Sequence, residues 1–168
     1  LLRHPQAASS LRDLSEGGWQ PVIDDAQARQ NPGQVRRLIL CSGKVYVDLI
    51  GSKQREQRPA IAMARLEQLY RFPADEVREL LDGYASLEEV VWLQEEPANM
   101  GAWDYVRPRL SELMGGRWPL RFVGRPQNAS PAEGSAAWHA ANQQAIVEQA
   151  YELAGEPAPS GLAVPAKT

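Results

Sequence analysis

The fold class is indicated first by the run Val35-Arg36-Arg37-Leu38-Ile39-Leu40-Cys41-Ser42. Its branched aliphatic residues barely alternate with polar ones, which is typical of a strand covered on both faces. A similar run lies at Glu89–Gln94, and two others lie at Ala60–Leu66 and Leu120–Gly124. The runs recur about every 25 to 30 residues, so we expect strands joined by segments long enough to hold helices.

Segments with helical spacing lie between these runs. In Ala74–Tyr84 the apolar residues recur at three- and four-residue intervals, Pro73 precedes the segment, and Asp75 and Glu76 fall in its first turn. We expect further helices at Val45–Lys53, at Gly101–Met114, where Pro108 should cause a kink or a break, and at Ala132–Leu153. Strands alternating with helices predict an α/β fold, a doubly wound and mainly parallel sheet with helices on both faces.

Composition excludes several other classes of protein. The chain has 168 residues, 43% of them hydrophobic and 23% charged, which suffices for one domain with a buried core. No apolar run approaches the ~20 residues of a membrane-spanning helix, so we expect no membrane partner. One cysteine and two histidines leave no internal disulfide and no metal site of thiolates or imidazoles. A net charge of -3 argues against a nucleic-acid partner.

We expect a single domain over residues 1–154. Residues 1–34 form a linking segment that can hold a helix start at Ser10–Asp13, an extra strand at Trp19–Ile23 and a loop at Asp24–Gly33. The proline-rich residues 155–168 predict a disordered tail. The chain starts without a methionine or a signal core, so we expect it to come from a longer protein.

Charge is unevenly distributed along the chain. Nine of the 18 Lys and Arg residues lie between Arg29 and Arg71, against three acidic residues, while Asp75–Glu96 holds eight acidic residues and one basic residue. Solvated helix faces are one interpretation of these runs. The other is a pair of complementary patches that dock neighbouring domains or a subunit.

Candidate site residues follow the first and third expected strands, because such sheets bind ligands beyond the carboxyl ends of their strands. In Ser42-Gly43-Lys44 the glycine permits a sharp turn, and Lys44 with free N–H groups can hold an anion, unless this is a plain strand-to-helix turn. The segment lacks the longer glycine-rich loop of a phosphate-loop motif. Glu95 and Glu96 should point to opposite faces and form no acid/base dyad. One can enter the crevice while the other caps a helix or pairs with an arginine.

The other two strand ends also carry charged residues. Arg65 and Glu67 share a face by alternation, and they can form an ion pair or hydrogen bonds to a neighbouring domain. Arg125 follows the fourth strand, where its guanidinium can either clamp a phosphate or pin the following loop to main-chain carbonyls. Ser130-Pro131 in that loop suits the start of a helix.

No residue of the chain forms an enzyme site alone, so we assign no catalytic residue. Cys41 lies within an expected buried strand, where a thiol behaves as a small hydrophobic group. Neither histidine has an obvious carboxylate partner, and we expect His139 to be a half-buried packing residue rather than a base.

Five segments in one order give the chain a family resemblance: Leu1-Leu2-Arg3-His4-Pro5, Leu40–Leu49, Arg65–Pro73, Gln94–Trp103 and Gly124–Gly134. Over about Leu1 to Tyr151 the chain resembles the C-terminal domain of the thiamine-dependent first component of the 2-oxoglutarate dehydrogenase complex. Sister enzymes that act on 2-oxoadipate share much of this pattern.

The resemblance implies a parent enzyme of the citric acid cycle that decarboxylates 2-oxoglutarate on thiamine diphosphate with magnesium. It would then pass the succinyl group to a lipoyl-bearing succinyltransferase component. The resemblance also implies a fold like the last domain of transketolase, a homodimer, contacts with other domains of the same enzyme, and an AMP or acetyl-CoA effector. A bacterial cytoplasmic location is favoured over a mitochondrial matrix.

The thiamine signature of that family, Gly-Asp-Gly followed later by Asn, is absent, and Asp82-Gly83 is only a fragment of it. Cofactor, metal and substrate residues are therefore expected outside this chain, and the chain alone is expected to be inactive. The family prefers other residues at Arg71, Met100 and Asn128, which bears on effector contacts more than on the fold.

Candidates for effector or interface contacts are Ser42, Lys44, Arg65, Glu67, Glu95, Glu96 and Arg125. The alternative interpretation is a self-standing nucleotide or acyl-CoA binding module. Its motivation is the basic stretch Arg29–Arg71 beside the glycine turn at Gly43.

Overall fold

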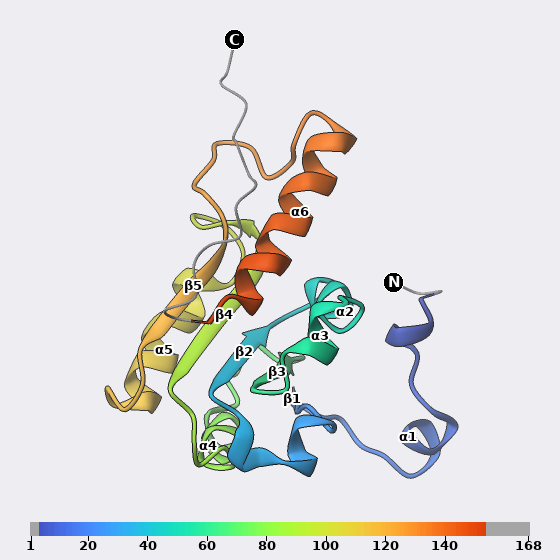
Figure 1. Cartoon of the computed structure of the whole chain (residues 1–168), viewed down its shortest axis with the longest axis vertical. Helices are drawn as coiled ribbons and strands as arrows, with labels where there is room; N and C mark the ends of the chain where they lie inside the picture. Colours follow the sequence, from blue (N-terminus) through green and yellow to red (C-terminus); the bar gives the residue numbers. More distant parts are fainter. Residues whose placement is uncertain (1–3, 154–168) are drawn as a thin grey trace.

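The computed structural model describes residues 4–153 and shows one five-stranded sheet with helices packed against it (Figure 1). The strand order is β1-β3-β2-β4-β5. All neighbouring strands run parallel except β1, which pairs antiparallel with β3 at the edge. The strands are β1 (Val22–Ile23), β2 (Arg37–Cys41), β3 (Ile61–Leu66), β4 (Glu89–Pro97) and β5 (Leu120–Arg125). The predicted α/β class, the mainly parallel sheet and the extra strand are thereby confirmed.

The helices are α1 (Leu11–Ser15), α2 (Val45–Ile50), α3 (Gln54–Gln57), α4 (Ala74–Asp82), α5 (Trp103–Met114) and α6 (Ala136–Tyr151). The helix predicted at Val45–Lys53 is shorter, because Gly51 ends α2 and α3 follows as a separate turn. The segment Asp24–Gly33, predicted as a loop, contains a 3-10 turn at Ala28–Gln30, and a second one follows at Pro32–Gln34. No helix within the described residues is long and apolar enough to cross a membrane.

Both faces of the sheet are buried, which explains why the first apolar run does not alternate. On one face α4 and α5 pack against Leu38, Leu40 and Trp92. On the other face α2 and α6 pack against Ile39 and Leu93. Successive side chains of β2 therefore enter different cores, and all five residues of this strand are buried.

The structure refines two expectations about helix boundaries. Of the kink or break expected at Pro108 the break is absent, because α5 continues through this residue, and the Arg109 side chain donates from Nη1 to the Tyr105 carbonyl at 2.6 Å in the turn around the proline. Helix α6 begins at Ala136, not at Ser130-Pro131. The Ser130 hydroxyl is instead used in a local turn, where it donates to the Ala132 carbonyl at 3.0 Å.

The N-terminal segment lies at the side of the domain, with α1 set apart from the sheet (Figure 1), and touches the body at Gln68 through the Trp19 indole N–H. Its short helix α1 starts where the sequence predicted, because Ser10 and Asp13 form a complete capping box. The apolar side chains of this segment are nevertheless uncovered, with Leu11 86% and Trp19 67% exposed. The tail predicted at 155–168 lies outside the described residues, and the domain boundary stays a prediction.

The basic and acidic runs of the sequence meet within the domain. Strands β2 and β4 run side by side, so Arg36 forms an ion pair with Glu88 and Arg37 forms one with Glu89. Part of the uneven charge is therefore neutralised internally, which neither the solvated-face nor the docking-patch interpretation anticipated.

Candidate functional site

The carboxyl edge of the sheet contains the topological switch point of the fold. The chain leaves β2 toward α2 on one face and leaves β4 toward α5 on the other, although the two strands are neighbours. Segments that leave adjacent parallel strands in opposite directions open a crevice between them, which is the usual ligand position in such sheets.

A crevice of about 360 Å³ lies at this point. We call it the carboxyl-edge crevice, and the lining residues used below are Ser42, Gly43, Tyr70, Trp92, Glu96 and Tyr105. Of the residues that the sequence singled out, it brings together Ser42 and Glu96. It does not include Lys44, Arg65, Glu67, Glu95 or Arg125. Tyr70 and Tyr105 were not predicted, because nothing in their spacing marks them as neighbours of this edge.

Gln94 shapes the turn that forms one wall of the crevice, and it is only 3% exposed. Its Oε1 accepts from the Trp92 indole Nε1 at 3.0 Å and from the Trp103 backbone N–H at 3.0 Å. Its Nε2 donates to three main-chain carbonyls, those of Glu96, Pro97 and Met100. One amide thus fixes both the end of β4 and the start of α5.

The two adjacent carboxylates point to different sides of β4, as predicted. Glu96 lines the crevice, whereas the Glu95 Oε2 accepts from the Gln143 Nε2 of α6 at 2.9 Å. The same Gln143 nitrogen donates to Asp48 Oδ2 at 2.7 Å, so one amide bridges two carboxylates. This role of Gln143 and Asp48 could not be predicted, because these two residues and Glu95 are far apart along the chain.

Arg125 is buried and pins the loop that follows β5. Its Nη1 donates to the Glu95 carbonyl, its Nη2 to Gln143 Oε1 at 3.0 Å, and its Nε to Glu133 Oε1 at 3.1 Å. Of the two alternatives for this guanidinium, the loop-pinning role is the one observed. Burial opposes ionisation of Glu133, but hydrogen bonds from Asn142 and Arg125 and the charge of Arg125 hold the pKa of Glu133 below its usual value.

The expectation that neither histidine has a carboxylate partner is wrong for His139. Its Nδ1 lies 3.5 Å from Glu133 Oε2 and 3.4 Å from the Arg125 Nη2. Its side chain is 57% exposed, which agrees with the half-buried position expected for it. The contact was not visible in the sequence because the irregular loop before α6 brings Glu133 back against the helix.

A second hollow lies between α2 and α6, with a volume of about 680 Å³. We call it the α2–α6 groove, and its polar lining includes His4, Gln6, Lys44, Asp48, His139 and Gln143. Gly43 has a positive φ of 73°, which confirms the sharp turn after β2. That turn directs Lys44 into this groove, where its Nζ lies 2.5 Å from Asp48 Oδ2.

Arg65 and Glu67 form the ion pair that their alternation predicted. The Arg65 guanidinium also lies over the Tyr46 ring, 4.7 Å from the ring centroid. Arg65 and Glu67 line a hollow together with Trp19 of the N-terminal segment, away from the carboxyl-edge crevice.

Cys41 has no exposed surface, and its Sγ lies 3.8 Å from the Ala64 carbonyl. Burial raises the pKa of the thiol to about 12. The thiolate is therefore absent at neutral pH, which is consistent with the predicted packing role.

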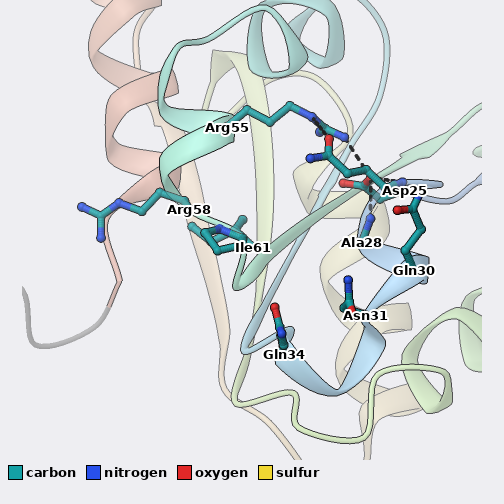
Figure 2. Close-up of a pocket in the computed structure, with 10 residues that line it drawn as sticks. Asp25, Ala28, Gln30, Asn31, Gln34, Arg55, Arg58 and Ile61 are labelled. Carbon is teal, nitrogen blue, oxygen red and sulfur yellow. Dashed lines mark hydrogen bonds and ion pairs between the residues drawn. The ribbon is translucent and has the colours of Figure 1, made fainter.

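Much of the predicted basic stretch lies at the opposite edge of the sheet. Arg55 and Arg58 line a small pocket of about 160 Å³ together with Gln34 and Ile61, near the amino ends of β2 and β3 (Figure 2). The Arg55 Nη2 lies 2.9 Å from Asp25 Oδ1, and Arg58 also has an interaction partner. This charge does not converge beside Gly43, so the arrangement differs from the one that motivated a self-standing module.

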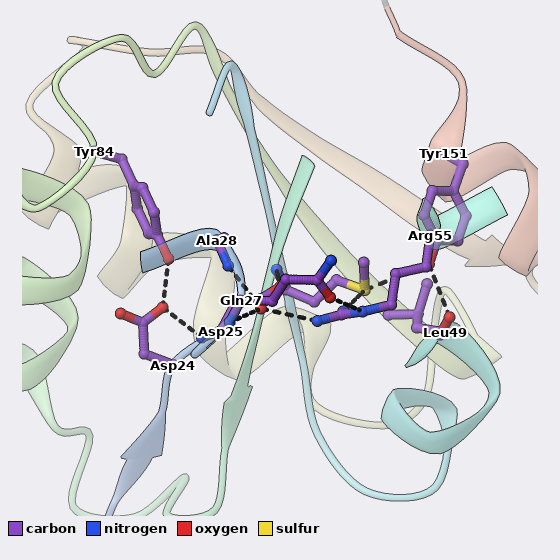
Figure 3. A network of polar contacts seen from close by, with 9 residues as sticks. Asp24, Asp25, Gln27, Ala28, Leu49, Arg55, Tyr84 and Tyr151 are labelled. Atoms are coloured by element: carbon purple, nitrogen blue, oxygen red, sulfur yellow. Dashed lines mark hydrogen bonds and ion pairs between the residues drawn. The ribbon is translucent and has the colours of Figure 1, made fainter. Parts of the chain in front are cut away.

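Asp25 anchors the linking segment to the sheet (Figure 3). Its Oδ1 accepts from the backbone N–H groups of Gln27 and Ala28 and from Arg55, and its Oδ2 accepts from the Met63 N–H of β3 at 3.1 Å. This carboxylate is 3% exposed and was missed in the sequence, where Asp24–Gly33 had no feature beyond a polar loop.

Asp25→Asn is expected to lower the free energy of unfolding by about 2 kcal/mol, because the amide keeps only one acceptor oxygen and leaves Arg55 without its counter-charge. Urea unfolding measures this change. Asp75→Asn is the matched control, since the Asp75 side chain is 88% exposed and pairs only within α4. Equal midpoints for the two variants would contradict the anchoring role.

The chain is similar in sequence to known proteins. A family model described as 2-oxoglutarate dehydrogenase C-terminal matches residues 8–151. The chain belongs to this family. It is 40% identical over 157 residues to the 2-oxoglutarate dehydrogenase E1 component of Bacillus mycoides and 41% identical to that of Bacillus anthracis. Each alignment covers 91% of this chain and 16% of the relative, so the chain spans about a sixth of the length of these proteins. The resemblance stated from the sequence is confirmed.

The carboxyl-edge crevice does not fit thiamine diphosphate with magnesium. Within residues 4–153, no group of three His, Cys, Asp or Glu side chains could hold a metal ion. The carboxyl-edge crevice carries a carboxylate and no cationic side chain in its lining, which is unfavourable for a diphosphate.

Proposed function

We propose that this domain, residues 1–154, is the C-terminal part of a 2-oxoglutarate dehydrogenase first component. That enzyme would oxidatively decarboxylate 2-oxoglutarate in the citric acid cycle with thiamine diphosphate and magnesium. The observation that carries the proposal is the family match over residues 8–151. Reaction at a cofactor depends on groups held close to it, and both the thiamine signature and a fitting crevice are absent from the described residues, so we place the chemistry in other parts of the enzyme.

An activity assay tests the proposal on two samples, the full-length gene product and the 168-residue chain. Both are incubated with thiamine diphosphate, magnesium and either 2-oxoglutarate or 2-oxoadipate. We expect decarboxylation of 2-oxoglutarate by the full-length protein and none by the chain alone. Turnover by the chain alone would overturn the assignment, and preference for 2-oxoadipate would move it to the sister enzymes.

The supporting role that we propose is structural. Large apolar side chains are exposed on the domain, and contact with another domain or a second copy would cover them: Leu11, Leu14, Trp19, Tyr70 and Trp138. In a homodimeric, cytoplasmic enzyme this domain would hold its neighbours in register while the succinyl group passes to a lipoyl-bearing component. Light scattering on the full-length protein is expected to give twice the mass of one polypeptide.

We further propose that an anionic effector, AMP or acetyl-CoA, binds in the α2–α6 groove rather than in the crevice. Lys44, His4 and His139 line this groove, and its one carboxylate among the described residues, Asp48, is paired with Lys44, whereas the crevice presents the Glu96 carboxylate, which is unpaired among these residues. Imidazole and ammonium groups attract phosphate, and a carboxylate repels it.

Lys44→Gln is expected to weaken AMP and acetyl-CoA binding about fivefold, as measured by calorimetric titration of the full-length protein. Lys53→Gln is the matched control, because Lys53 does not line the groove. Unchanged affinity in Lys44→Gln would remove the groove from the proposal. Equal affinity of the 168-residue chain would support the alternative of a self-standing binding module.

A further inference from the structure

We propose that the carboxyl-edge crevice binds an organic cation, an ammonium or guanidinium group carried on an apolar body. This site is separate from the α2–α6 groove and does not depend on the proposed effector. Its ligand class follows from the charge, the hydrogen-bonding state and the aromatic character of the lining.

The charge of the lining is negative. Among the described residues that line the crevice, Glu96 is the only one with a charged side chain, and no ion pair with another described residue is seen for it. Lys44, which follows Gly43 of the crevice lining, lines the α2–α6 groove instead and pairs with Asp48. An incoming cation would therefore meet an available carboxylate.

Trp92 and Gln94, the two most buried lining residues, which we call the floor of the crevice, offer no spare polar group. Trp92 is completely buried, and its indole N–H donates to Gln94. Gln94 in turn uses both its oxygen and its nitrogen in the five hydrogen bonds described above. A ligand that needed several hydrogen bonds from the floor would leave its polar atoms unpaired, whereas an apolar body loses nothing there.

Two tyrosines also line the crevice. Tyr70 is 82% exposed, and Tyr105 belongs to α5. The Tyr105 ring already attracts one guanidinium, since the Arg109 Cζ lies 3.6 Å from its centroid. Arg109 itself does not line the crevice, because it is held by the Tyr105 carbonyl. Rings of this kind favour cations over neutral or anionic groups of the same shape.

A glycine lets the carboxylate lie against the turn. Gly101 has a positive φ of 66°, and a Cβ at this position would come within 3.1 Å of both the Cβ and the Oε2 of Glu96. Any larger residue would displace the Glu96 side chain from its present position. The carboxylate thus has a defined place at the mouth of an aromatic crevice.

The test uses the full-length protein and five probes, measured by calorimetry and by the NMR shift of the Trp92 indole N–H. The cations are 2-phenylethylammonium, as a free small molecule, and N-acetyl-arginine methylamide, as a stand-in for a protein side chain. The comparison compounds are 2-phenylethanol, phenyl phosphate and AMP. We expect both cations to bind with a dissociation constant on the order of 1 mM, and the neutral and anionic compounds to leave the Trp92 signal unmoved.

Variants assign the binding to the crevice. Glu96→Gln and Tyr70→Leu are each expected to weaken cation binding about fivefold, and both positions are exposed, so folding is retained. Glu95→Gln is the matched control, because the neighbouring carboxylate faces α6. Tighter binding of the arginine derivative would identify a protein side chain as the source, and tighter binding of the amine a free metabolite. The proposal is overturned if neither cation binds, if phenyl phosphate binds equally well, or if Glu96→Gln changes nothing.

Discussion

Arg37→Met is expected to lower the free energy of unfolding by about 4 kcal/mol, measured by urea denaturation. Arg37 has no exposed surface, yet all three of its donor nitrogens are used. Its Nε and Nη2 donate to Glu89 Oε1, and its Nη1 donates to the Ala150 carbonyl near the end of α6 at 2.8 Å. Burial lowers the pKa of Arg37, while the hydrogen bond with Glu89 and its charge favour the ionised form. Removing the guanidinium leaves the Glu89 carboxylate in a site that is mostly closed to water.

The adjacent residue supplies a matched control. Arg36 pairs with Glu88 across the same two strands, but both side chains are more than half exposed. Arg36→Met is therefore expected to cost less than 1 kcal/mol. Arg121, whose Nε lies 3.7 Å from Glu89 Oε2, compensates the remaining carboxylate only in part, so a double variant, Arg37→Met with Glu89→Gln, should recover part of the loss. Similar costs for Arg36→Met and Arg37→Met would contradict the argument from burial.

These neighbouring arginines illustrate how far sequence reasoning reaches for this fold. The strand at Val35–Ser42 was predicted from its apolar residues, and β2 lies within it at Arg37–Cys41. The spacing of apolar residues and the local composition identified the strands and helices, because burial of an element selects apolar residues at regular positions along it. Neither apolar spacing nor composition could predict that Arg37 is buried and Arg36 exposed. That difference depends on which arginine lies beneath the end of α6.

The candidate site shows the same division between local and distant effects. The sequence placed Ser42 and Glu96 at strand ends, and predicted that Glu95 and Glu96 diverge, because alternation is a local property. It did not predict that Gln143 bridges Asp48 and Glu95, or that Tyr70 and Tyr105 line one crevice. Those relations join elements far apart along the chain, and they exist only after the sheet and both helical layers have assembled.

Gln94→Leu is expected to lower the free energy of unfolding by about 4 kcal/mol, because leucine has a similar size but no polar atoms. The Trp92 indole and the Trp103 N–H lose their acceptor, and three main-chain carbonyls lose their donor. Urea unfolding followed by tryptophan fluorescence measures both the stability and the environment of Trp92. The matched control is Gln144→Leu on α6, where the glutamine is exposed and donates to Glu148 one turn away. We expect the control to change stability by less than 0.5 kcal/mol. If the two variants unfolded at the same urea concentration, the turn after β4 would not depend on Gln94, and the wall of the carboxyl-edge crevice would need another support.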